Sequence, residues 1–242
     1  MNLIIDIGNT RVKLAVFKAN RLLEKVIVDK KVFLTEVKKI ISNQPKITNA
    51  IVSSVDFFTK EEEFQLRALV KLTIVSHDLN LPFTNNYATP KTLGVDRIAL
   101  ITAAAHQYPS KNVLVIDAGT CVTYDFLNQK NTYLGGAISP GLTIRYEALH
   151  NLTAKLPLLE TDDAIFLIGN TTEKSIHSGV SNGLVNEIDG TIKQYQELYT
   201  DLTVILTGGD TNFLAKRLKS SIFANSNFLL EGLNHLLKIN ID

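Results

Sequence analysis

The stretch LIIDIGNTRVKL, residues 3–14, indicates how the fold begins. Its apolar run ends at Asp6, the polar turn Gly8-Asn9-Thr10 follows, and apolar residues alternate again from Val12. This pattern predicts a buried strand, a tight turn and a second strand. A carboxylate at the end of a buried strand, just before a glycine turn, raises the question of a function.

The same pattern occurs a second time in VLVIDAGTCVTY, residues 113–124. Here the apolar strand ends at Asp117, and Gly119 and Thr120 follow it. A single D-x-G-x-T indicates little, because Asp and Gly end strands in many proteins. Two copies, each at the start of one half of the chain, favour a shared function. A third glycine-rich turn, at residues 207–210, follows a strand and opens a helix.

The two halves of the chain repeat one order of elements. In the first half the patterns predict strands near 2–6, 11–17, 22–28, 50–55 and 72–77, with helices near 32–41, 60–70 and 97–108. In the second half they predict strands near 113–117, 121–127 and 131–138, a strand and turn over 204–210, and helices near 143–152, 171–199, 211–219 and 229–238. We therefore predict an α/β protein of two duplicated βββαβα domains, residues 1–108 and 109–242.

The composition narrows the class of protein. Of 242 residues, 45% are hydrophobic and 20% charged, which is ordinary for a globular protein, and the formal net charge is +1. So small a net charge disfavours nucleic acid and membrane surfaces as partners. The single cysteine, Cys121, rules out an intramolecular disulfide. The first apolar run is too short for a signal peptide or a membrane span, so we expect a soluble cytoplasmic protein.

The repeated turn suits the binding of phosphate groups. Glycine lets successive backbone amides turn toward an anion, and a nearby carboxylate can hold Mg²⁺ or its waters. Two such turns, one from each domain, would enclose a polyphosphate in an interdomain ATP cleft, and Lys13 would add positive charge. This arrangement suits phosphoryl transfer, which depends mostly on positioning and charge neutralisation. The sequence has neither a P-loop nor a G-x-G-x-x-G after a strand.

An ordered set of motifs resembles the type III pantothenate kinases, which belong to the acetate and sugar kinase, Hsp70 and actin superfamily. The first phosphate motif of that family resembles residues 6–10, and its second resembles residues 117–120. The matching segments are Asp6-Ile7-Gly8-Asn9-Thr10, Gly94-Val95-Asp96-Arg97, Asp117-Ala118-Gly119-Thr120, Gly135-Gly136-Ala137-Ile138-Ser139-Pro140-Gly141 and Thr153-Ala154-Lys155-Leu156-Pro157. The resemblance extends over nearly the whole chain.

The resemblance implies ATP-dependent phosphorylation of pantothenate to 4′-phosphopantothenate, the first step of coenzyme A biosynthesis. It also implies two actin-like (ribonuclease H-like) domains, a need for Mg²⁺ and for a monovalent cation, K⁺ or NH₄⁺, and a homodimer whose pantothenate pocket lies near the dimer interface.

The resemblance further implies a role for individual residues. Asp96 matches the general base, Asp117 the ligand of the monovalent cation, and Asp6 a position near Mg²⁺. The positions that match ATP contacts are Asp6, Ile7, Gly8, Asn9, Thr10, Arg11, Val12, Lys13 and Thr120. Those that match pantothenate contacts are Tyr87, Gly94, Val95, Asp96, Arg97 and Thr172. Gly208 and Gly209 resemble a wall near the nucleotide.

Simpler interpretations of several residues remain open. Asp96 could serve only as a helix cap, for about 1 kcal/mol. Arg97 could be an exposed helix arginine, and Lys13 an exposed strand lysine. Asn170 replaces a basic residue of the family pattern and could be an N-cap, with Glu173 completing a capping box. Whether Thr171 or Thr172 is the substrate contact therefore stays open.

Two other functions also remain open. One is a different small-molecule kinase or phosphatase of the same superfamily. The other is a non-catalytic nucleotide-binding regulator, although the sequence contains no evident helix-turn-helix module or basic arm for direct contact with DNA.

Overall fold

The computed structural model describes residues 1–55, 58–163 and 166–241. These residues form two compact units, residues 1–109 together with 228–242, and residues 110–227. The boundary after residue 109 lies one residue from the expected one. The last helix, however, belongs to the first unit, whereas the sequence pattern assigned it to the second.

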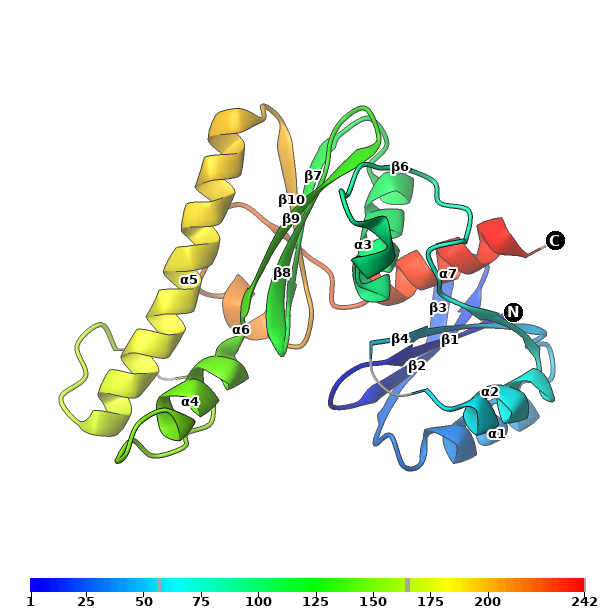
Figure 1. Ribbon diagram of the computed structural model, residues 1–242, viewed down its shortest axis with the longest axis horizontal. Coiled ribbons are helices and arrows are strands. Elements are labelled where there is room, and N and C mark those ends of the chain that lie inside the picture. The colour runs from blue at the N-terminus through cyan, green and yellow to red at the C-terminus, as the bar shows by residue number, and fades with distance from the viewer. Residues whose placement is uncertain (56–57, 164–165, 242) are drawn as a thin grey trace. The chain divides into compact units, whose positions relative to one another are not determined.

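The first unit contains a mixed sheet between two pairs of helices (Figure 1). Its strands are β1 (Asn2–Ile7), β2 (Val12–Lys18), β3 (Arg21–Val28), β4 (Asn49–Ser54) and β5 (Lys71–Ile74), in the order β3-β2-β1-β4-β5. Strands β1, β2 and β3 are antiparallel neighbours, and β4 and β5 continue the sheet in parallel. The helices are α1 (Phe33–Asn43), α2 (Lys60–Arg67), α3 (Val95–Gln107) and α7 (Phe228–Asn240).

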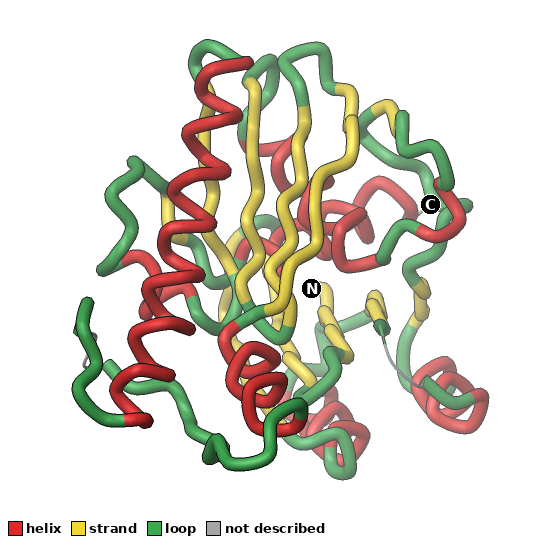
Figure 2. The backbone as a smooth tube through the Cα atoms, turned by 60° about the vertical axis from the view of Figure 1, so that its left-hand side comes forward, coloured by secondary structure: helices red, strands yellow, loops and turns green. Residues whose placement is uncertain are grey.

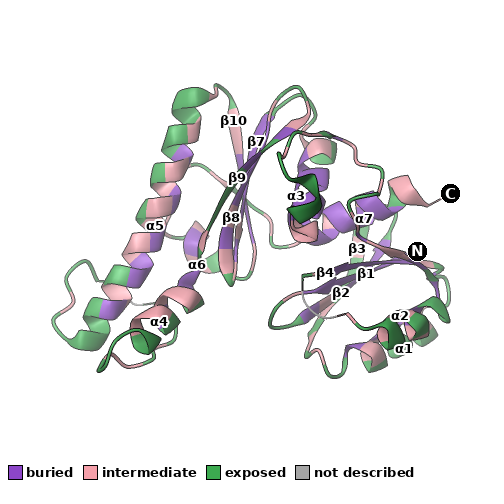
Figure 3. Ribbon diagram, viewed as in Figure 1, coloured by how far each residue is buried: buried purple, intermediate pink, exposed green. Residues whose placement is uncertain are grey.

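Strand β1 is buried on both faces (Figure 3). Leu3, Ile5 and Ile7 pack in one core with residues of α1 and α2. Because side chains alternate along a strand, Ile4 and Asp6 face the side covered by α3 and α7. Two short elements precede α3, the strand β6 (Thr84–Asn85) and a 3₁₀ turn at Pro90–Thr92.

Side-chain fit explains why α7 packs in the first unit. A Cβ atom at Gly232 would lie 1.9 Å from the carbonyl oxygen of Ala99, so only glycine permits this approach of α7 to α3. The buried Asn234 accepts a hydrogen bond from the Nδ2 of Asn2 and donates one to the carbonyl oxygen of Ala19, each 2.9 Å long. None of these contacts follows from the apolar spacing that predicted the helix.

The second unit repeats the topology of the first. Its strands are β7 (Asn112–Ala118), β8 (Cys121–Leu127), β9 (Thr132–Pro140), β10 (Leu202–Thr207) and β11 (Phe223–Ala224), in the order β9-β8-β7-β10-β11. The first three are again antiparallel neighbours and the last two again parallel additions. The predicted duplication is therefore confirmed in strand order and direction.

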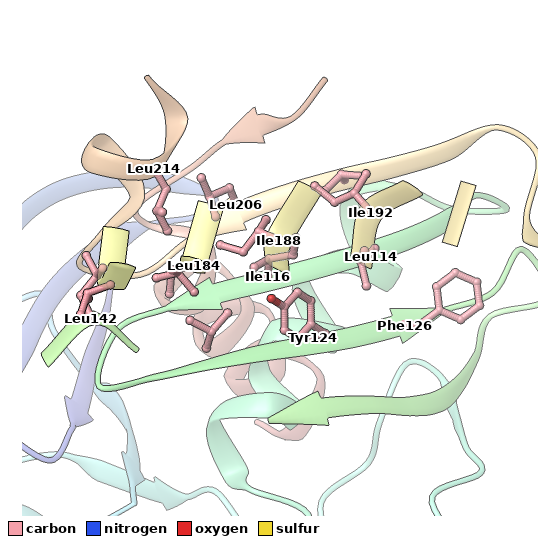
Figure 4. Close-up of a cluster of buried hydrophobic side chains, with 14 of the residues drawn as sticks. Leu114, Ile116, Tyr124, Phe126, Leu142, Leu184, Ile188, Ile192, Leu206 and Leu214 are labelled. Carbon is pink, nitrogen blue, oxygen red and sulfur yellow. The ribbon is translucent and has the colours of Figure 1, made fainter. Parts of the chain in front are cut away.

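The helices of the second unit are α4 (Leu142–Asn151), α5 (Thr172–Leu198) and α6 (Thr211–Ala215). Helix α5 runs along one face of the sheet (Figure 2). The apolar residues Leu184, Ile188 and Ile192 on α5 pack against Leu114 and Ile116 on β7 (Figure 4). In the described parts of the chain, no helix combines the length and apolar character that crossing a bilayer requires.

Candidate active site

In the first unit, Asp6 and Lys13 lie opposite each other at the end of the β1–β2 hairpin. Register pairs the two residues, and the Lys13 Nζ lies 3.3 Å from the Asp6 Oδ2. The Asp6 side chain is 6% exposed and the Lys13 side chain 34%. Lys13 is therefore an ion-pair partner and not a freely exposed strand lysine. The turn between them is closed by a 3.1 Å hydrogen bond from the Gly8 amide to the Arg11 carbonyl.

Burial is the main influence on the Asp6 carboxyl. It raises the pKa of Asp6, and the negative charge of Asp96 raises it further, while Lys13 acts in the opposite direction without reversing the shift. Asp96 is thus close enough to Asp6 to affect its ionisation. An incompletely neutralised, buried carboxylate is the kind of group that a hard cation such as Mg²⁺ would stabilise, so the donor chemistry fits a Mg²⁺ site.

Asp96 lies in the first turn of α3, whose N-cap is Gly94. The interpretation of Asp96 as the helix cap is therefore wrong, although its Oδ1 does accept the Arg97 amide at 2.9 Å. A Cβ atom at Gly94 would lie 2.4 Å from that oxygen, so glycine leaves room for the carboxylate. The motif Gly94-Val95-Asp96-Arg97 thus presents a half-buried carboxylate at a helix N-terminus, where negative charge is favoured.

Arg97 and Tyr87 lie together beside this carboxylate. Arg97 is only 4% exposed, so its interpretation as an exposed helix arginine is wrong. Its guanidinium carbon lies 5.6 Å from the centre of the Tyr87 ring, which is within the range of a cation–π contact. The structure therefore brings Asp6, Lys13, Tyr87, Asp96 and Arg97 into one unit, although they are spread over ninety positions of sequence.

Sequence reasoning missed one residue that supports this motif. His77 follows β5, and its Nε2 lies 2.8 Å from the carbonyl oxygen of Leu93, the residue before Gly94. A lone histidine in a loop carries no spacing signal that could have identified this contact.

In the second unit, Asp117 occupies the end of β7, as Asp6 does on β1. Its neighbour across the hairpin is Thr123 on β8. Among the described residues, the buried Thr123 Oγ1 has no hydrogen-bond partner. Cross-strand partners share one face of a sheet, so a carboxylate and a buried hydroxyl lie side by side there. Oxygen donors of this kind fit a hard monovalent cation.

The glycine turn after β10 packs directly on Asp117. Gly208 has φ +99°, and a Cβ atom there would lie 2.1 Å from the Ala118 carbonyl and 2.4 Å from the Asp117 Oδ1. The next residues include Asp210, whose amide donates to the Ala118 carbonyl and whose pKa burial raises to about 6. Thr120 is exposed on the neighbouring turn.

The start of α5 resolves the helix-cap question. The N-cap is Thr171, whose Oγ1 accepts the Lys174 amide at 3.2 Å. The interpretation of Asn170 as the cap, with Glu173 in a capping box, is therefore wrong. Thr172 is the first helical residue, and residues 169–172 line a cavity of about 780 Å³ together with Leu149, Leu156 and Ile176.

Comparison with known proteins identifies the family. The sequence profile of the type III pantothenate kinases matches residues 2–194. The type III pantothenate kinase of Flavobacterium johnsoniae is 49% identical over 242 residues, covering 100% of this chain and 99% of that protein. That of Christiangramia forsetii is 52% identical over 240 residues, covering 99% of each.

A solved structure supports the fold. A ROK family glucokinase from Streptomyces griseus, in complex with glucose and AMPPNP, matches with a TM-score of 0.55 at 11% identity, over 99% of this chain and 98% of that chain. Its likeness agrees with the predicted pair of actin-like domains. Together with the full-length relatives, the profile match shows that this chain belongs to the type III pantothenate kinase family.

Proposed function

We propose that the protein transfers the γ-phosphoryl group of ATP to pantothenate, giving 4′-phosphopantothenate and ADP in the first step of coenzyme A biosynthesis. The observation that carries this proposal is the group formed by Asp6, Lys13 and Asp96. One carboxylate is buried beside an ammonium group, and a second carboxylate lies close by at a helix N-terminus. Such a pair can separate the tasks of phosphate positioning and proton transfer.

Asp96 is the proposed general base. The Arg97 amide bonds to Oδ1 and fixes the carboxylate, which then accepts the proton of the primary hydroxyl of pantothenate as that oxygen attacks the γ-phosphorus. The positive Arg97 guanidinium would pair with the negative pantothenate carboxylate. The face of the Tyr87 ring contacts the guanidinium and holds it in place. In the second unit Thr172 is the proposed contact, because the Thr171 hydroxyl already caps α5.

The segment from Asp6 to Lys13 is the proposed phosphate-binding stretch, and Thr120 is a further contact of ATP. Lys13 contributes positive charge to the phosphates, and Asp6 would hold Mg²⁺ or its waters. When bound, the metal supplies charge neutralisation for the phosphoryl group. Asp117 is the proposed ligand of K⁺ or NH₄⁺. The Thr123 hydroxyl across the hairpin supports this, because it has no hydrogen-bond partner in the part of the chain that the structure describes.

A homodimer in the cytoplasm is also part of the proposal. Between α4 and α5 in sequence, several large apolar side chains are mostly exposed, namely Leu152, Leu158, Leu167 and Ile168. The Oγ of Ser178 donates to the Leu167 carbonyl, which holds that segment against α5 with its side chains outward. Exposed apolar side chains of this kind favour association, and a second copy of the chain is the partner we propose.

Light scattering after size exclusion tests the dimer. The substitutions Leu167→Asp and Ile168→Asp should each give monomers, whereas Leu198→Asp, at the other end of α5 and 76% exposed, should leave the dimer intact. Dimers in all three variants would contradict this interface. A monomeric wild-type protein would contradict the dimer itself.

The function is tested by ADP release from Mg·ATP with and without pantothenate, in K⁺ and in Na⁺ buffer, with the product identified by mass. Pantothenate-dependent turnover that needs K⁺ would support both the reaction and the cation site. Equal turnover in the two buffers would remove the cation site alone. Phosphorylation of a sugar would favour another kinase of the superfamily, and ATP binding without turnover would favour a nucleotide-binding regulator.

A further inference from the structure

A polar cluster centred on Arg145 and Glu187, two residues outside the family motifs, joins four elements of the second unit. At its centre the Arg145 Nη2 on α4 bonds to the Glu187 Oε2 on α5. The same nitrogen donates to the Ser139 Oγ at 3.2 Å, and the Arg145 Nε donates to the Pro140 carbonyl at 2.8 Å. On its other side, Glu187 accepts the hydroxyl of Tyr124 on β8 at 3.0 Å.

The cluster is built to remain charged. Burial alone would raise the pKa of Glu187. Hydrogen bonds from Arg145, Ser139 and Tyr124 outweigh this effect and hold the pKa below its usual range. The two charged side chains are 21% and 30% exposed, so both are mostly removed from water. Arg145 uses separate nitrogens for Pro140 and for Glu187, a geometry that a lysine ammonium cannot reproduce.

The cluster leads directly to the turn that carries Thr120. Pro140 on β9 pairs with Cys121, the residue after Thr120. The next amide, that of Gly141, donates to the Thr120 carbonyl at 3.0 Å. A Cβ atom on Gly141 would lie 2.0 Å from the Gly119 carbonyl, so the two segments are in backbone contact. Arg145 thus holds the strand end against which the turn is packed.

We propose that the Arg145–Glu187 ion pair is a positioning device for the nucleotide, because it fixes the Pro140–Gly141 segment and, through it, the turn at Thr120. The proposal rests on the proposed role of Thr120 as an ATP contact. It predicts that loss of the pair weakens ATP binding and leaves the pantothenate KM unchanged.

The test compares Arg145→Met, Arg145→Lys and Glu187→Gln with the wild type. Arg67→Met is a matched control, because Arg67 on α2 also bonds to a carboxylate, that of Glu63, and to a backbone carbonyl, that of Leu72. Affinity for ATP is measured by calorimetry without pantothenate, and kcat and both KM values by ADP release. Thermal unfolding records the loss of stability in every variant.

We expect Arg145→Met to raise the Kd and KM for ATP about tenfold, the factor that corresponds to about 1.4 kcal/mol. Arg145→Lys should regain thermal stability but not ATP affinity, because it keeps the charge and loses the Pro140 contact. Glu187→Gln should lie between wild type and Arg145→Met, and Arg67→Met should bind ATP as the wild type does.

Variants that lose stability but keep wild-type ATP affinity would overturn the proposal, as would a rise in the pantothenate KM alone. If Arg145→Met does not fold, Arg145→Lys and Glu187→Gln decide, since each keeps part of the cluster. The binding measurement needs no turnover, so a wild-type protein that binds ATP but does not phosphorylate pantothenate would refute the proposed function and still test this inference.

Discussion

Replacing Asp96 with Asn tests the assignment of the general base with little disturbance of the structure. Asparagine has the same shape, and its side-chain oxygen can accept the Arg97 amide that the Asp96 Oδ1 accepts at 2.9 Å. The space above Gly94 suits either side chain. The substitution also removes a negative charge that raises the pKa of Asp6. The unfolding free energy should therefore change by less than about 1 kcal/mol, a shift of about 2–4 °C or less in Tm.

Turnover should fall much further. An asparagine amide cannot accept the hydroxyl proton, and loss of a general base typically costs about 10²–10⁴ in rate. At about 1.36 kcal/mol for each factor of ten, this range corresponds to about 2.7–5.4 kcal/mol of activation free energy. The loss should appear in kcat, with the ATP Kd unchanged, because a general base acts in the transition state and not in nucleotide binding.

The assay is ADP release with saturating ATP and pantothenate, together with calorimetric ATP binding and thermal unfolding. Asp29→Asn is the matched control, because Asp29 also accepts a nearby amide, that of Lys31 at 2.9 Å, but lies on the surface. A kcat for Asp96→Asn within about tenfold of the wild type would refute the base assignment. A large loss of turnover accompanied by a comparable loss of stability would assign Asp96 to the structure of the helix start instead.

Three further changes test the surroundings of the site. Gly208→Ala should lower the unfolding free energy by about 1–3 kcal/mol or more, because φ is +99° and the new Cβ would lie 2.1 Å from the Ala118 carbonyl. A Cβ at Gly209 would contact nothing within 4 Å, so Gly209→Ala should have the Tm of the wild type. Burial raises the pKa of Asp6, so the stability contributed by its protonated form is lost as pH rises from near 3.8 through the raised value. Asp6→Asn should therefore have a higher Tm than the wild type at pH 7, but not below pH 3.8. The variant should also bind Mg·ATP more weakly. An equal Tm difference at both pH values would contradict this reasoning. His77→Ala should lower kcat by roughly tenfold, because it removes the hydrogen bond to the Leu93 carbonyl just before the Gly-Val-Asp-Arg motif. His77→Gln keeps a donor, so its kcat should fall less. Identical kinetics of the two variants would count against that contact.

The order of elements along the chain was the most predictable feature, because it depends on a local pattern that occurs twice. Apolar runs that end at Asp6 and Asp117 start each unit, and both runs form central strands. The position of α7 was not predictable from apolar spacing. It depends on the contact of Gly232 with Ala99, two residues far apart in sequence whose fit appears only when both helices are present.

The candidate site could be predicted to a similar extent. The pairing of Asp6 with Lys13 follows from the short turn, since hairpin register places residues across from each other. The burial of Arg97 and the hydrogen bonds of Arg145 do not follow from any local pattern. A charged side chain on a helix is usually exposed, and its burial depends on partners from other elements, here Tyr87 for Arg97 and Glu187 for Arg145.

The duplicated hairpins differ in the side chain that lies across from the aspartate. In the first copy, seven positions separate Asp6 from its cross-strand partner Lys13, whereas six separate Asp117 from Thr123. The cross-strand partner is thus a hydroxyl in the second copy and an ammonium group in the first. In the first copy the ammonium group would face the anionic phosphates, and the incompletely neutralised carboxylate would hold Mg²⁺ or its waters. In the second copy a carboxylate and a hydroxyl lie side by side, and this pair of oxygen donors is the feature behind our proposal of a monovalent cation there.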